Sequence, residues 1–143
     1  MTRSGFVRRH RLLIGGLAAA LVLLAGLYRL SPLWPGPALP AGAMPLTLAT
    51  APGHLLPTLG CTTALLAPTR VAVAGNALVL VPPTGGDPIK VVFPSGWRAW
   101  RLDGRAELVS RDGVVVGREG DIVEGLGGGT GDDGAFEVCS VGQ

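Results

Sequence analysis

Apolar residues near the start of the chain form one long block, whereas those after residue 60 come in short runs between turn residues. The block LLIGGLAAALVLLAGLY covers residues 12–28 and contains no charge. As a helix it would extend about 25 Å, and a few more residues would bring it close to the ~30 Å hydrocarbon core of a bilayer. The arginines that precede the block are Arg3, Arg8, Arg9 and Arg11. Since positive flanks stay cytoplasmic, the pattern predicts a cytoplasmic basic tail at 1–11 and a transmembrane helix at 12–30. It also predicts a single-pass protein of the cell membrane whose C-terminal part is extracytoplasmic.

A cleaved signal peptide is the alternative interpretation of this start, because it too begins with a charged segment and an apolar stretch. Its best cleavage motif is Ala41-Gly42-Ala43, which lies far beyond the apolar block. That distance favours an uncleaved signal anchor, and either interpretation predicts export of the remaining chain.

Residues 31–59 predict a proline-rich linker, since they hold seven of the 12 prolines and no charged residue. Prolines at this density disfavour helices and central strands and favour an extended chain.

Residues 60–143 predict a small β domain, because no stretch after residue 30 has a helical period of useful length. Asp103-Gly104 and Asp112-Gly113 are hairpin signals, and they predict a three-stranded meander from Trp97 to Arg118. A domain of this size has a small core, so we expect a closed or partly open β-barrel. The expected strands cover residues 62–66, 71–74, 77–81, 89–93, 97–102, 105–110, 114–118, 122–126 and 136–141.

The two cysteines are placed to join the ends of the β domain. Cys61 opens it and Cys139 lies in its last predicted strand, so no CxxC motif is present. Export permits a disulfide, which would bring the first and last strands together. Free reactive thiols are the alternative, but no histidine or lysine is near either cysteine in sequence to activate one.

Charge changes the picture of a basic protein that the net charge of +2 suggests. Residues 1–29 carry five basic and no acidic residues, whereas residues 30–143 carry seven basic and ten acidic residues. The exported part therefore has a net charge of −3, which makes a nucleic-acid partner unfavourable.

The β domain lacks the residues for most catalytic sites. Its serine and cysteine side chains, which could act as nucleophiles, have no histidine in the domain to serve as a general base. His10 lies before the apolar block and His54 lies in the linker. The run 129–134 satisfies GxGxxG, but it has no following helix to bind a phosphate, and we expect a flexible hairpin loop at 125–134. We therefore expect no enzyme activity, no cofactor and no metal site.

One cluster suggests a ligand site. Trp97-Arg98-Ala99-Trp100-Arg101 alternates aromatic and cationic side chains, which can stack on sugars and pair with anions. On a strand the two tryptophans point to opposite faces, so one is expected in the core and the other near the surface. The candidate ligand-binding residues are Arg98, Trp100 and Arg101.

Several turn motifs carry a family resemblance over residues 60–141. They are Val91-Val92-Phe93-Pro94-Ser95-Gly96-Trp97, Asp103-Gly104, Asp112-Gly113-Val114-Val115-Val116, Glu119-Gly120-Asp121 and Gly127-Gly128-Gly129. With them the chain resembles small exported OB-like β-barrel domains of membrane-anchored bacterial proteins. The resemblance implies an oligonucleotide/oligosaccharide-binding-like barrel and implies no activity.

These patterns together predict a membrane-anchored, non-enzymatic binding or envelope-interaction module. Its expected partners are the membrane and an envelope protein or cell-wall glycan. No nucleic-acid partner is expected. The alternatives are a cell-wall glycan-binding domain that uses the Trp/Arg cluster and a secreted protein with a cleaved signal peptide.

Overall fold

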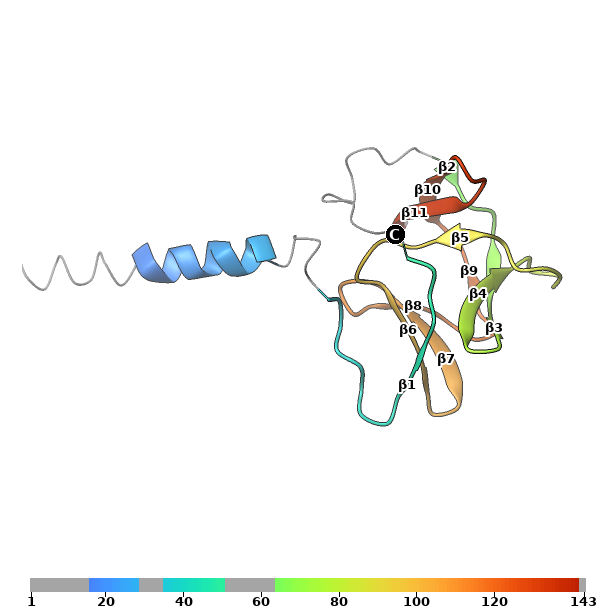
Figure 1. Cartoon of the computed structure of the whole chain (residues 1–143), viewed down its shortest axis with the longest axis horizontal. Helices are drawn as coiled ribbons and strands as arrows, with labels where there is room; N and C mark the ends of the chain where they lie inside the picture. The colour runs from blue at the N-terminus through green and yellow to red at the C-terminus, as the bar shows by residue number, and fades with distance from the viewer. Residues whose placement is uncertain (1–15, 29–34, 51–63, 142–143) are drawn as a thin grey trace, which may run out of the picture. The chain divides into compact units, whose positions relative to one another are not determined.

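The computed structural model describes residues 16–28, 35–50 and 64–141. The chain divides into two units, Met1–Trp34 and Pro35–Gln143. The described part of the first unit is a helix over residues 16–28, and that of the second unit consists of strands and turns (Figure 1).

Among the described residues, no helix is long and apolar enough to cross a membrane. The predicted transmembrane helix and signal anchor at 12–30 are therefore wrong, and so is the predicted single-pass location in the cell membrane. The predicted basic tail at 1–11 lies outside the described residues.

The strands of the second unit form three sheets (Figure 1). The first sheet has the order β1 (Met44–Leu46), β6 (Arg98–Leu102), β7 (Arg105–Val109) and β8 (Val115–Arg118). The second has the order β2 (Ala64–Leu65), β10 (Leu126–Thr130), β11 (Phe136–Val141) and β5 (Val91–Val92). The third has the order β4 (Ala77–Val81), β3 (Thr69–Ala74) and β9 (Ile122–Val123).

All three sheets are open, so the predicted OB-like β-barrel is wrong. Strands β2, β5 and β9 are only two residues long, too short to continue a ladder around a closed barrel. Isolated bridges link neighbouring sheets instead, as between Thr47 and Ala77 and between Leu80 and Ile89. The prediction of a mainly β domain is confirmed for the described residues.

The predicted meander from Trp97 to Arg118 is confirmed, since β7 pairs antiparallel with both β6 and β8. Its first turn has φ values of 50° at Asp103 and 81° at Gly104. Two positive φ values in succession define the type I′ turn, whose twist matches that of the flanking strands. Asp-Gly is favoured there because aspartate tolerates this region and glycine enters it without steric cost.

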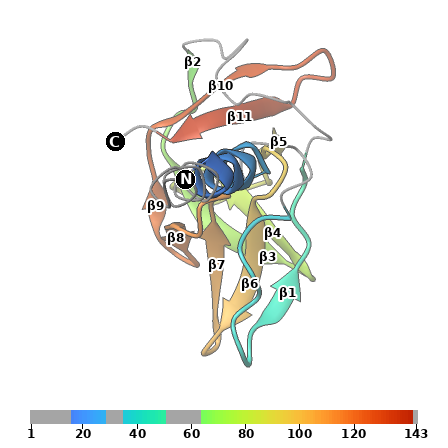
Figure 2. The same ribbon diagram turned by 90° about the vertical axis from the view of Figure 1, so that its left-hand side faces the viewer.

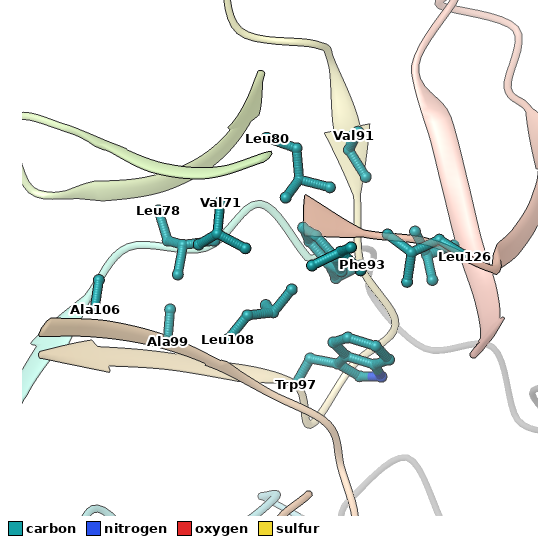
Figure 3. Packing of buried hydrophobic residues seen from close by; sticks show 12 residues of the cluster. Val71, Leu78, Leu80, Val91, Phe93, Trp97, Ala99, Ala106, Leu108 and Leu126 are labelled. Atoms are coloured by element: carbon teal, nitrogen blue, oxygen red, sulfur yellow. The ribbon is translucent and has the colours of Figure 1, made fainter. Parts of the chain in front are cut away.

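The core of the second unit lies where the three sheets face one another. Leu78 and Val71 come from the third sheet, Leu108 from the first and Leu126 from the second, and Figure 3 shows them pointing toward a common centre. The buried cluster consists of Val71, Leu78, Leu80, Val91, Phe93, Trp97, Ala99, Ala106, Leu108, Val123, Leu126 and Val138.

The predicted proline-rich linker differs from the structure at residues 35–50. This segment belongs to the second unit, and β1 within it pairs antiparallel with β6, as the strand beside β6 in Figure 2 shows. Leu46 and Leu48 pack against the core. Pro45 is tolerated because β1 is an edge strand, where a missing N–H breaks no second ladder. The linker's remaining residues, 31–34 and 51–59, lie outside the described residues.

The second unit ends in the hairpin of β10 and β11. The glycine-rich run expected to be a flexible loop thus supplies a paired strand at Leu126–Thr130. Cys139 lies half-buried on β11 and is not a free cysteine. Cys61 lies outside the described residues, so the disulfide between the two stays a prediction.

Candidate functional site

Four side chains lie in a row across the first sheet, on the face that points away from the core. The register aligns Pro45 of β1 with Trp100 of β6, Trp100 with Glu107 of β7, and Glu107 with Arg118 of β8. The Trp100 indole Nε1 donates to Glu107 Oε2 at 3.0 Å, and Arg118 Nε donates to Glu107 Oε1 at 2.9 Å. Both carboxylate oxygens of Glu107 are therefore engaged by side chains of the neighbouring strands.

The environment of Glu107 favours its ionised form. Burial by itself raises the pKa of this carboxyl, which is 11% exposed. The hydrogen bonds from Arg118 and Trp100 and the charge of Arg118 outweigh burial and bring the pKa below the ordinary value of 4.5. A carboxylate so held is a poor general acid, and its partners give it a structural role.

The structure separates the three predicted ligand-binding residues. Trp100, expected near the surface, is only 5% exposed, and its indole N–H is bound by Glu107. Arg101 aligns with Met44 and Ala106 and therefore lies on the opposite face of β6 from Trp100. Arg98 is exposed and remains the member of the three that lines an open groove.

This groove has a volume of about 490 Å³ and lies between the start of β6 and the segment that contains β1. Its apolar wall includes Leu39, Leu46, Leu48 and Trp97. Trp97 is 8% exposed and packs its ring against Phe93 with the centroids 5.3 Å apart. The core thus fixes one wall, while the segment 35–50 forms the other.

Close backbone contacts hold this segment against β6. An added Cβ at Gly36 would overlap the Gly96 carbonyl oxygen, so only glycine permits this approach. Arg98 fastens the same place, because its Nε and Nη2 donate to the Pro35 carbonyl oxygen at 3.0 and 2.6 Å. The groove's shape therefore depends on Gly36, Gly96 and Arg98.

The polar side chains that line the groove are Thr50, Ser95 and Arg98, two hydroxyls and one cation. No carboxylate, histidine or cysteine is among its lining residues. The described residues also hold no cluster of three metal-ligating side chains, and both histidines lie outside the described ranges. The groove's chemistry suits binding through apolar contacts and hydrogen bonds.

Sequence reasoning missed the wall formed by residues 35–50. Met44, Leu46 and Leu48 alternate with other residues, which is the period of a strand. The density of prolines around them favoured a linker instead. This alternation was the signal that could have identified the wall.

No family model matches this chain, and neither a curated protein nor a solved structure was found to be similar to it. The resemblance to exported OB-like domains therefore stays a prediction, apart from the closed barrel that the open sheets contradict.

Proposed function

We propose that the second unit is a non-enzymatic binding module whose groove takes an extended apolar peptide segment of a partner protein. The observation that carries this proposal is the open groove of about 490 Å³ with Leu39, Leu46, Leu48 and Trp97 in its wall. Apolar clefts of this size with a few placed polar groups are the usual form of a ligand site.

The two hydroxyls favour a peptide as the ligand. Thr50 and Ser95 can hydrogen-bond the N–H and C=O groups of an extended chain. A purely hydrocarbon ligand would cover these hydroxyls without offering them a partner, which costs free energy. The openness of the groove leaves the ligand's other backbone groups in contact with water.

The cell-wall glycan alternative depended on stacking by Trp100. That ring is buried and its N–H is already bound by Glu107, so Trp100 offers no free face to a sugar. No observation favours this alternative, and the peptide groove is the function we carry forward.

The test uses the full chain and a library of fluorescently labelled pentapeptides composed of Ala, Leu, Val, Pro and Phe. We expect fluorescence anisotropy to detect binding and Leu39→Asn to weaken it about fivefold by removing apolar contact in the groove. Leu39 is 46% exposed, so this change should leave the fold intact.

The matched control is Leu65→Asn, because Leu65 is 70% exposed on β2 and does not line the groove. It should bind the library as the wild type does. Absence of binding, or an equal loss in both variants, would contradict the proposal.

A further inference from the structure

The groove has one charged lining residue, and that residue is an exposed arginine without a carboxylate partner. Ion pairs join Lys90 to Asp133 and Arg118 to Glu107, and neither of them involves Arg98. The Pro35 carbonyl that Arg98 binds is neutral. The positive charge of Arg98 is therefore not neutralised by these contacts.

The same contacts orient the guanidinium of Arg98. Nε and one hydrogen of Nη2 are directed at Pro35 O, at 3.0 and 2.6 Å. A guanidinium has five N–H donors, so three remain, including both on Nη1. A side chain already fixed at two donors loses less conformational entropy when it binds a ligand with the others.

The charge of the groove is positive, because Arg98 is its charged lining residue and no aspartate or glutamate lines it, although residues 30–143 carry a net charge of −3. This local sign favours an anionic group on the ligand.

We infer that the groove recognises the C-terminus of an apolar peptide and that Arg98 binds its free α-carboxylate. This inference rests on the proposed function and adds the part of the partner that is bound. Guanidinium and carboxylate form charge-assisted hydrogen bonds, and the apolar wall takes the preceding side chains. A fatty acid has the same head group, but its tail would leave the Thr50 and Ser95 hydroxyls without partners.

The experiment compares two forms of the same pentapeptide library, one with a free C-terminal acid and one with a C-terminal amide. With the full-length wild-type chain, we expect the acid form to bind about fivefold more tightly, as for an ion pair at an exposed site. Raising the salt concentration should reduce this ratio, because exposed charges are screened.

Arg98→Gln should bring the acid-to-amide affinity ratio close to one, and this ratio is the readout because any change in the groove's shape would affect both forms alike. Glutamine can still donate to the Pro35 carbonyl, so the variant removes the charge and keeps a tether for the segment. Arg105→Gln is the matched control, because Arg105 is exposed at the Asp103-Gly104 turn and does not line the groove.

The outcomes separate this inference from the proposed function. Equal binding of acid and amide forms would overturn the inference and leave the peptide groove standing. Binding of neither form would overturn both. Tighter binding of decanoate than of any peptide would identify a lipid carboxylate as the ligand and overturn the inference. A dimer in sedimentation that Leu39→Asn dissociates would identify a second copy of this chain as the occupant, with the same consequence.

Discussion

The carboxylate of Glu107 is bound on either side, by Trp100 and by Arg118. Both partners donate hydrogen bonds, which suits the ionised carboxylate. A protonated carboxyl would carry an O–H group for which neither donor offers an acceptor. Because the folded protein lowers the pKa of Glu107 below 4.5, the ionised group stabilises the fold above that pH. This contribution is lost as the pH falls through the lowered pKa.

We expect Glu107→Gln to lower the free energy of unfolding at neutral pH by about 2 kcal/mol. The NH2 group of the glutamine would face the N–H of either Trp100 or Arg118, and two donors cannot hydrogen-bond each other. In the wild type, protonation of Glu107 contributes to the fall in the free energy of unfolding below pH 4.5. The variant lacks this carboxyl, so its free energy of unfolding should fall less over the same pH range. Urea unfolding at several pH values measures both effects.

Asp133→Asn is the control for this prediction. The pKa of Asp133 is also lowered, chiefly by the hydrogen bond from Lys90, but both side chains are more than half exposed. Solvent screens such a pair, so the variant should unfold much like the wild type. Equal effects of the two substitutions would contradict the role given to burial at Glu107.

For single residues, the Trp/Arg cluster shows that a local pattern predicts which face of a strand a side chain occupies but not whether that face is buried. Alternation along β6 correctly places Trp97 and Trp100 on opposite faces, and Trp97 is in the core as one of the two was expected to be. The second face is covered as well, since Val109 on that face is fully buried. The sequence could not predict this burial, because the packing of a sheet face depends on parts of the chain that no local pattern specifies.

At the scale of elements, β10 depends on glycine for its close approach to β11. An added Cβ at Gly128 would overlap the Glu137 carbonyl oxygen and come within 2.8 Å of Phe136 Cε1. We expect Gly128→Ala to lower the free energy of unfolding by about 3 kcal/mol, because backbone must move to admit the methyl group. Chemical denaturation provides the measurement.

Gly131→Ala is the matched variant in the same hairpin. Its added Cβ would meet Glu137 Oε1, the far end of a flexible side chain that can move away. It should cost clearly less than Gly128→Ala, and a reversed order would refute this account of β10.

Strand β1 makes a second prediction at this scale. A chain that begins at residue 51 lacks β1 and the half-buried Leu46 and Leu48 that pack against the core. We expect it to be less stable by about 4 kcal/mol than a chain that begins at Pro35, from the loss of two partly buried leucines and a paired strand. Urea midpoints compare the two chains, and equal midpoints would contradict the assignment of 35–50 to the β unit.

At the scale of the whole molecule, the predicted Cys61–Cys139 disulfide would close a loop of 78 positions. The loop-entropy relation gives about 4 kcal/mol for such a loop, so reduction should lower the free energy of unfolding by that order. Unfolding with and without reductant measures it. In Cys61→Ser the reductant should have no effect, and two titratable thiols in the native wild type would exclude the bridge.

Most of the second unit's strands could be predicted because their information is local. Asp103-Gly104 fixes a hairpin whatever surrounds it, and the short apolar run 77–81 and the alternating run 105–108 mark strands without knowledge of their partners. β10 and β1 were missed because glycine and proline lower strand propensity. The pairing of β1 also depends on β6, which is distant in the sequence.

The sequence by itself determined that residues 64–141 form short strands joined by glycine turns, since backbone dihedral preferences and the two-residue period act over a few neighbours. Only the tertiary structure decided that three open sheets share the core, that Trp100 is buried beside Glu107, and that residues 35–50 complete a groove at Arg98. The physical reason is that such pairings depend on the shape and burial of surfaces brought together from distant parts of the chain, which no local preference specifies.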